Sequence, residues 1–181
     1  MRLLVIGAGM MGSAAAYDMA RQTDVHSVTL ADSDLRRARE VAARINRIRG
    51  EKKVRATSLD AADEKASVRL MKAHDAALSA VPYFLNLGLA RAAIAARCHF
   101  ADLGGNNTVV RQELALAGKA QRAGVAIAPD CGLSPGMASI LGGELVRRLG
   151  GRADALRLYV EVYRKSPCRP FTINSSFRWK G

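Results

Sequence analysis

The chain has 181 residues, of which 49% are hydrophobic and 24% charged, and 28 Lys and Arg stand against 16 Asp and Glu. This composition is typical of a globular protein with one full hydrophobic core, and the length is short for two domains. No apolar run approaches the length of a membrane span, and the chain starts directly with a strand pattern; we therefore expect no signal peptide, no membrane partner and a cytoplasmic location.

The chain opens with the apolar run 2–6, followed by glycines spaced G-x-G-x-x-G and then a small-residue helix pattern. This order is typical of a dinucleotide-binding turn. In such a turn Gly7 allows the tight bend, Gly9 lets backbone approach a pyrophosphate, and Gly12 lets the helix pack closely on the strand. The alternative is an ordinary turn that binds nothing. The residues predicted to hold the cofactor here are Gly7, Ala8, Gly9, Met10, Met11 and Gly12.

An acidic residue is expected about 20 positions after the last glycine, where it would bind the ribose hydroxyls. Asp32 stands there, directly after a second predicted strand over 26–31 and directly before Ser33. We predict that Asp32 and Ser33 contact the cofactor. A carboxylate at this position favours NAD, because it repels a 2′-phosphate, but Arg36 and Arg37 lie close enough to leave NADP open.

Much of the net charge of +12 lies in and just after a predicted helix from Asp34 to Arg49. Its predicted buried face holds Leu35, Ala38, Ala42, Ile45 and Ile48, which leaves five arginines outside. That pattern is typical of a solvated helix face, and no aromatic residues or nucleic-acid motif accompany it. We therefore expect no nucleic-acid partner, and some of this charge can attract an anionic dinucleotide.

The following elements alternate between strand and helix signals. The predicted strands are 53–57, 74–81, 98–103 and 124–128. One predicted helix starts at Asp60, with Asp63 and Glu64 in its next turn, and two further helices are predicted over 83–97 and 108–123. Repeated strand, helix, strand units give a parallel sheet with helices on both faces. The fold class is therefore α/β, a Rossmann-type doubly wound parallel sheet, with a dinucleotide-binding domain over 1–130.

The fourth predicted strand ends in Ala80 and Val81, and Pro82 stops it. Small side chains and a rigid turn at the carboxyl end of such a strand suit contact with a nucleotide. A proline that simply starts the next helix is the alternative.

No set of metal ligands or triad can be assembled from the cysteines and histidines, which are far apart: Cys98, Cys131, Cys168, His26, His74 and His99. Reduced thiols and structural or surface histidines are the expectation, with no metal.

Residues 131–181 are predicted to begin an incomplete α+β domain for substrate binding or dimerisation. Ser134 and Pro135 predict a helix start, and Gly150 with Gly151 its end. A strand over 156–163 alternates apolar and polar residues, and the segment 167–181 is not expected to build a sheet by itself. An unpaired strand with an apolar face predicts homo-oligomerisation through this segment or a poorly ordered tail.

Four stretches together resemble the saccharopine dehydrogenase family, and within it the lysine 6-dehydrogenases. They are the glycine turn over 5–12, Ala-Val-Pro-Tyr over 80–83, Ala-Asp-Leu-Gly-Gly over 101–105 and Pro-Asp-Cys-Gly-Leu-Ser-Pro-Gly-Met over 129–137. The last is the most specific. Members of the family continue into a further domain, whereas this sequence stops at Gly181, so we expect a fragment or a chain completed by a partner.

The resemblance implies an NAD(P)-dependent oxidation at a carbon that bears nitrogen, with lysine or a saccharopine-like amino acid as substrate. In a lysine 6-dehydrogenase, hydride leaves the ε-carbon of lysine and the resulting imine hydrolyses to the semialdehyde. Placed by this resemblance along the cofactor are Ala80, Val81, Pro82, Leu103 and Gly104, and near the nicotinamide Gly132, Pro135, Gly136 and Met137. Tyr83 and Asp130 stand where catalytic groups could lie, but the resemblance assigns no catalytic residue. A dinucleotide-binding module without catalysis is the alternative.

Overall fold

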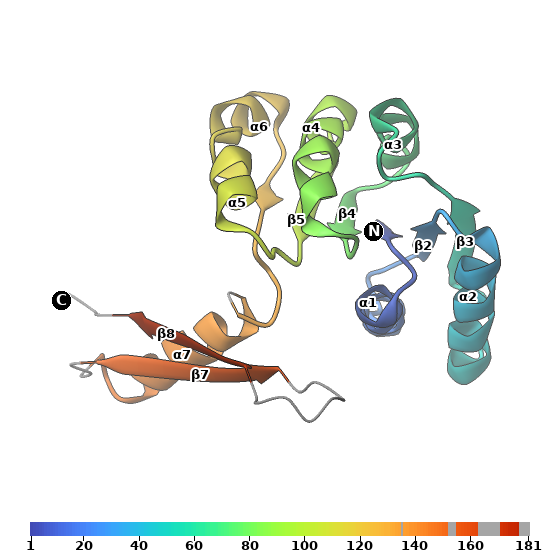
Figure 1. Cartoon of the computed structure of the whole chain (residues 1–181). Coiled ribbons are helices and arrows are strands. Elements are labelled where there is room, and N and C mark those ends of the chain that lie inside the picture. Colours follow the sequence, from blue (N-terminus) through green and yellow to red (C-terminus); the bar gives the residue numbers. More distant parts are fainter. Residues whose placement is uncertain (135, 152–154, 163–170, 178–181) are drawn as a thin grey trace. The chain divides into compact units, whose positions relative to one another are not determined.

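The structure, a computed structural model, describes residues 1–134, 136–151, 155–162 and 171–177 (Figure 1). The chain divides into two compact units, Met1–Asp130 and Cys131–Gly181. No helix among the described residues is both long and apolar enough to cross a membrane. Cys168 lies outside the described residues.

The first unit is built on a six-stranded sheet in the order β3-β2-β1-β4-β5-β6, with every neighbouring pair parallel. The strands are β1 (Arg2–Ile6), β2 (Ser27–Asp32), β3 (Val54–Ser58), β4 (Ala76–Ser79), β5 (His99–Asp102) and β6 (Ile127–Ala128). The chain winds outward in one direction from β1 and in the other from β4. The doubly wound Rossmann-type fold predicted from the sequence is therefore confirmed.

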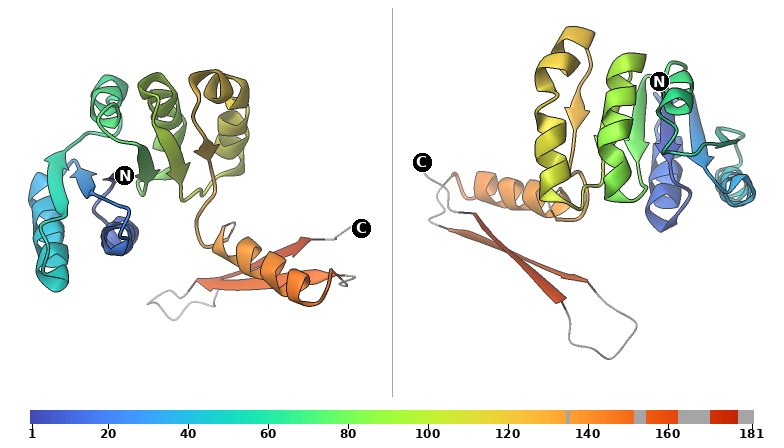
Figure 2. Two further views of the ribbon diagram at one scale, coloured as in Figure 1. Left: turned by 180° about the vertical axis from the view of Figure 1, so that it is seen from behind. Right: turned by 45° about the horizontal axis from the view of Figure 1, so that its top comes forward.

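Helices cover both faces of this sheet (Figure 1 and Figure 2). On one face lie α1 (Met10–Arg21) and α2 (Leu35–Arg49), and on the other α3 (Glu64–Met71), α4 (Asn86–Ala96), α5 (Asn107–Leu114) and α6 (Ala117–Ala123). Successive residues of β1 point to opposite faces, so Leu3 and Val5 pack with α1 and α2, whereas Leu4 and Ile6 pack with α3 and α4. This central strand is therefore buried on both sides and fixes where its carboxyl end opens.

The basic helix has the predicted ends. Asp34 Oδ1 accepts a hydrogen bond from the Arg37 amide at 3.1 Å, and Gly50 ends α2 in the left-handed conformation. Ala38, Ala42 and Ile45 are buried as expected. The prediction for Ile48 is wrong: it lies 61% exposed, beyond the edge of the sheet-facing stripe.

The helix expected from Asp60 begins later. Asp63 caps α3 by accepting the Ala66 amide at 2.9 Å, while Asp60 Oδ1 accepts the Ala62 amide and closes the preceding turn. Two acids within reach of free amides compete for the cap, and the later one prevails because the earlier one stabilises a turn of its own.

Two other predicted helices are subdivided. The 83–97 helix starts as the 3₁₀ turn η1 (Tyr83–Leu85) before α4. The 108–123 helix is two helices, α5, which Asn106 caps, and α6, separated at Ala115 and Leu116. Leu116 is buried in the core, and its amide bonds to the Glu113 carbonyl three residues earlier, so the break turns this side chain inward.

The second unit contains α7 (Met137–Arg148) and a two-stranded antiparallel sheet of β7 (Leu156–Val162) and β8 (Phe171–Phe177). The expectation of an unpaired strand is therefore wrong, because β8 pairs with β7 along its length. Gly142 of α7 faces Leu156 and Leu158 so closely that an added Cβ would lie 2.7 Å from a Leu156 methyl carbon. Tyr163, the expected end of the strand, lies outside the described residues.

Candidate functional site

The glycine turn lies at the carboxyl end of β1, beside the end of β4, where the winding direction of the sheet reverses. The Gly7 amide donates to the Ala31 carbonyl at 2.7 Å, and the Ala80 amide donates to the Ile6 carbonyl at 2.7 Å. Ligands of doubly wound sheets bind in the crevice at this reversal. The fold therefore brings the first predicted site residues to the expected place.

Two of the three glycines are required by the protein's own packing. Gly7 has φ +104°, and an added Cβ would lie 2.7 Å from the Ala80 carbonyl oxygen. An added Cβ on Gly12 would overlap the Gly7 carbonyl, as close packing of α1 on β1 predicts. Neither position can carry a side chain without shifting backbone.

Gly9 differs from both. Its φ of −70° is open to any residue, and an added Cβ would meet nothing within 4 Å. Gly9 is the N-cap of α1 and supplies no side-chain hydrogen bond to the first amides of the helix. A bare helix N-terminus beside open space is suited to an anion, because its amides point outward and its dipole favours negative charge.

Asp32, the last residue of β2, holds the turn. Its Oδ2 accepts the Ala8 amide at 2.6 Å, and its Oδ1 accepts the Asp34 amide at 2.9 Å and the Ser33 hydroxyl at 3.5 Å. The carboxylate is half-buried, so part of it still faces the crevice.

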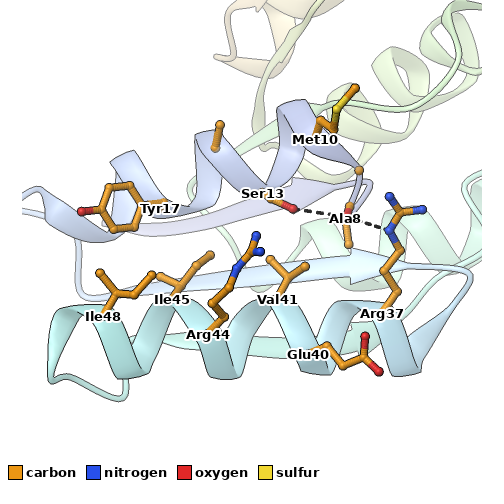
Figure 3. Close-up of a pocket in the computed structure, with 12 residues that line it drawn as sticks. Ala8, Met10, Ser13, Tyr17, Arg37, Glu40, Val41, Arg44, Ile45 and Ile48 are labelled. Atoms are coloured by element: carbon orange, nitrogen blue, oxygen red, sulfur yellow. Dashed lines mark hydrogen bonds between the residues drawn. The ribbon is translucent and has the colours of Figure 1, made fainter.

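The carbonyl of Ala8 is held from the other side (Figure 3). Arg37 Nε of α2 donates to this oxygen at 3.0 Å, and Ser13 Oγ of α1 donates to it at 3.3 Å. The Ala8 peptide is thus fixed at both its amide and its carbonyl.

A cavity of about 290 Å³ opens between the glycine turn, the ends of β2 and β3, and the end of β4. Seven predicted site residues line it: Gly7, Gly9, Asp32, Ser33, Ala80, Val81 and Pro82. Six residues that the prediction did not include as cofactor contacts also line it: Ile6, Arg37, Leu59, Asp60, Ala61 and Leu85. Residues 59–61 follow the third parallel strand, whose carboxyl end lies beside that of β2, and this position was the signal that could have identified them.

The loop after β5 forms a second cluster at the same edge of the sheet. Gly104 has φ +73° and packs against the Asp130 carboxylate, and Gly105 has φ +121° and packs against Tyr83. Asp102 Oδ1 accepts the Gly104 amide at 2.6 Å and the Asp130 amide at 3.3 Å. Leu103 and Gly104 therefore sit in a loop with a fixed backbone, outside the 290 Å³ cavity.

These contacts bear on Tyr83 and Asp130, the two positions where catalytic groups could lie. The Tyr83 ring stands edge-on to Phe84, with centroids 5.9 Å apart, and its Cβ side supports Gly105. Asp130 adopts a left-handed conformation, φ 62°, with its carboxylate against Gly104. Both have structural contacts that account for their positions.

The sequence profile of the family described as the saccharopine dehydrogenase NADP binding domain matches residues 3–128. The chain belongs to this family. The resemblance given by the sequence stretches is confirmed at the level of the family. The family description names NADP, which agrees with the expected NAD(P) class of cofactor.

The fold of this saccharopine dehydrogenase NADP-binding domain is also found in solved structures. An apo saccharopine dehydrogenase (L-Glu forming) from Saccharomyces cerevisiae matches with a TM-score of 0.68 and 22% identity, over 83% of this chain and 31% of that chain. A quinate dehydrogenase from Corynebacterium glutamicum in complex with NAD matches with 0.52 and 22%, over 70% and 43%. A UDP-N-acetylglucosamine 3-dehydrogenase from Acidithiobacillus ferrooxidans matches with 0.60 and 22%, over 86% and 44%. The chain spans less than half the length of each.

The residues predicted to lie near the nicotinamide belong to the second unit of the chain. Gly132 and Gly136 form a bridge, and the Met137 amide donates to the Gly132 carbonyl at 2.8 Å. Gly136 caps α7 at φ 120°, so the prediction that Ser134 caps this helix is wrong: loop carbonyls take the first amides instead of a hydroxyl. Pro135 lies outside the described residues.

The structure places thiols and histidines as follows. Cys98 is buried, and this burial raises the pKa of its thiol to about 11; Cys131 is exposed. His74 bridges the Leu70 carbonyl and Thr29 Oγ1, and His99 Nδ1 accepts the Ala126 amide, so both are structural. Among the described residues no group of three or more His, Cys, Asp and Glu is arranged to hold a metal ion.

Proposed function

We propose that this chain is the dinucleotide-binding part of an NAD(P)-dependent oxidoreductase acting on a CH–NH group of an amino acid. The observation that carries the proposal is Gly9: no packing within the described residues requires a glycine there, and the space beside it adjoins an uncapped helix N-terminus. A ligand phosphate accounts for both features. Family membership supports the same assignment.

The proposed contacts follow the turn and the cavity. The residues Gly7–Gly12 would hold the pyrophosphate, Asp32 and Ser33 the adenosine ribose, and the 290 Å³ cavity the adenine, with Ala80, Val81 and Pro82 along one wall. Leu103 and Gly104, and the loop with Gly132, Pro135, Gly136 and Met137, are proposed to lie toward the nicotinamide. When bound, the nicotinamide accepts a hydride from the substrate carbon.

Cofactor choice depends on two groups of opposite charge. Asp32 favours NAD because its carboxylate repels a 2′-phosphate, whereas Arg37 lines the same cavity and can accept one. We propose NAD as the main cofactor, with NADP binding allowed by Arg37.

The test is direct titration of the purified chain with NAD and NADP, followed in the protein or by calorimetry. Gly9→Ala would place a Cβ in the open space without touching the protein, so we expect an unchanged melting temperature and at least a tenfold loss of NAD affinity. Gly118→Ala, on the exposed surface of α6, is the matched control and should bind as the unaltered chain does. Equal binding by the Gly9 variant would remove the phosphate assignment.

The substrate is assigned by measuring catalytic turnover. We propose lysine, as in lysine 6-dehydrogenases, with a saccharopine-like secondary amine as the next candidate. Lysine-dependent reduction of NAD, measured by the absorbance of the reduced cofactor, tests this. Binding of NAD without turnover would favour a non-catalytic module. The packing contacts of Tyr83 and Asp130 are consistent with that alternative. Loss of both binding and turnover would contradict either reading.

We also propose that the chain forms homo-oligomers through its second unit, in the cytoplasm. The exposed large apolar side chains of α7 and its C-cap are Met137, Ile140, Leu141, Leu145 and Leu149. Contiguous apolar side chains on one helix mark an association surface. Light scattering should show an oligomer that Ile140→Gln with Leu145→Gln dissociates; a monomer before substitution would contradict the proposal.

A further inference from the structure

Two carboxyl groups are buried beneath the loops at the ends of β5 and β6. Asp102 ends β5 and is 0% exposed, and Glu113 of α5 is 1% exposed. Their carboxyl groups are in hydrogen-bonding contact. Charged groups are rarely buried so completely unless something neutralises them.

No cation neutralises this pair among the described residues. The charged groups that act on Glu113 are Asp102 from β5 and Asp130 after β6, which are both acidic. The single charged residue of α4, Arg91, is exposed. Three further bases on α5 and α6 are exposed too: Arg111, Lys119 and Arg122. On the side of α6 and β6, Glu113 borders a hollow with the neutral lining residues Leu114, Ala117, Ala120, Gln121, Val125 and Ile127.

The oxygens of the pair are used unequally. Asp102 Oδ1 accepts the amides of Gly104 and Asp130, one from each loop. Asp102 Oδ2 and both Glu113 oxygens are buried and accept no hydrogen bond from any donor group among the described residues. Two ionised carboxylates in contact would leave these oxygens unsatisfied and repelling each other, whereas one proton between them removes the repulsion and satisfies Asp102 Oδ2 and one Glu113 oxygen.

We propose that Glu113 retains a proton and donates it to Asp102 Oδ2, and that Glu113 thereby acts as a positioning residue for the loops after β5 and β6. Asp102 keeps its negative charge, which strengthens its bonds to the Gly104 and Asp130 amides. Those bonds hold Gly104 and Asp130 in left-handed conformations. Glu113 touches no cofactor; it acts through Asp102 on the loop proposed to lie toward the nicotinamide.

The raised pKa of Glu113 sets the pH range in which this proton is lost. Burial, and after it the nearby Asp102 and Asp130, raise the pKa of Glu113 from its ordinary 4.5 to about 8. Above pH 8 the native pair becomes two anions, and we expect the loops to loosen and cofactor affinity to fall, by at most about tenfold per pH unit for one proton.

Stability responds in a different pH window. Between pH 4.5 and 8 the unfolded chain has released this proton while the native chain keeps it. Because the unfolded state then binds fewer protons, stability falls as pH rises through this window and the fall ends above pH 8. The two windows distinguish this assignment from a merely structural role.

The experiment compares the unaltered chain with Glu113→Gln, which donates an N–H to Asp102 and cannot ionise. NAD affinity and urea unfolding are measured from pH 5 to 9.5. We expect the affinity of the unaltered chain to fall above pH 8 and that of E113Q to stay level. Glu51→Gln, which removes an exposed carboxylate beside β3 at the other edge of the sheet, should behave as the unaltered chain. The same pH dependence in E113Q, or none in the unaltered chain, would overturn the proposal.

The effect on affinity rests on the proposed function, so a ligand-free measurement separates the two. If NAD and NADP fail to bind at every pH, the proposed function fails, and the stability difference between the unaltered chain and E113Q still decides: it must change from pH 5 to 8 and be constant above. If E113Q does not fold, carbon NMR of the Glu113 carboxyl in the unaltered chain replaces it. Titration near pH 8 supports the proposal, and titration near pH 4.5 overturns it.

Discussion

Asp32 and Asp102 occupy equivalent positions in the two halves of the sheet. Each is the last residue of its strand, and each accepts an amide two residues further on and an amide from the loop of a neighbouring strand. They differ in their companions. Asp32 is half-buried and lines the same cavity as the cation Arg37, whereas Asp102 is fully buried and has the acid Glu113 as its neighbour. The same pattern of backbone hydrogen bonds therefore forms a half-exposed site beside the cavity in one half of the sheet and a buried site that depends on a proton in the other.

The largest expected effect is a loss of stability when the buried aspartate, Asp102, is removed. Asp102→Ala leaves the Gly104 and Asp130 amides unsatisfied and Glu113 without its partner, so we expect a loss on the order of 3 kcal/mol in the free energy of unfolding. Urea unfolding at pH 7 measures it. Asp32→Ala, measured alongside, should lose about 1 kcal/mol because water can replace its half-exposed bonds. Equal losses would mean that burial does not distinguish the two aspartates.

The second prediction concerns NAD binding, for which Asp32, and not Asp102, is the proposed direct contact. Asp32→Ala should weaken NAD binding by about tenfold to a hundredfold, because the ribose loses hydrogen bonds to a charged acceptor. Calorimetric titration measures this. Asp63→Ala, which removes the cap of α3 outside the cavity, is the control. Unchanged affinity in the Asp32 variant would show that the ribose lies elsewhere.

A smaller effect should follow from Arg37→Gln. Removal of the guanidinium should lower NADP affinity by about tenfold and NAD affinity less, since only NADP has a 2′-phosphate to pair with it. Parallel titrations give the ratio of the two affinities. Arg36→Gln is the matched control, because Arg36 is exposed, pairs with Glu40 and does not line the cavity. An unaltered ratio would exclude Arg37 from cofactor choice.

The smallest effect is expected from Asp102→Asn. The carboxamide oxygen can still accept the two loop amides, and its N–H can donate to Glu113 in place of the shared proton. We expect a change within about 1 kcal/mol at pH 7 and a shallower fall in stability from pH 5 to 8 than in the unaltered chain. Urea unfolding across this range measures the slope, and an unchanged slope would contradict the assigned proton.

The sequence was sufficient for features that depend on local spacing. The three glycines, Asp32 and the alternation of strands and helices predicted the sheet and one wall of the cavity. Features made by tertiary contact were missed: Leu59, Asp60 and Ala61 join the cavity because β3 lies beside β2. The capping of α7 was missed because backbone carbonyls, which every sequence has, replace the predicted serine.

The buried acid was missed for a different reason. Glu113 follows the polar residues Arg111 and Gln112 and looks like a surface residue when the sequence is taken one position at a time. It nevertheless falls three and seven positions before Leu116 and Ala120, which are both buried. Apolar spacing at i, i+3 and i+7 marks one helix face, so an acid within that pattern was a signal of burial.

The hydrogen bonds that fix the Ala8 peptide have a consequence for the kinetics of cofactor binding. Asp32 fixes the Ala8 amide while Arg37 and Ser13 fix the Ala8 carbonyl, so the turn is already rigid before any ligand arrives. Preorganisation of this kind places the ordering entropy in folding rather than in binding. Association should then proceed in one kinetic step, with the geometry of the pyrophosphate cradle set in part by Arg37 in the first turn of α2.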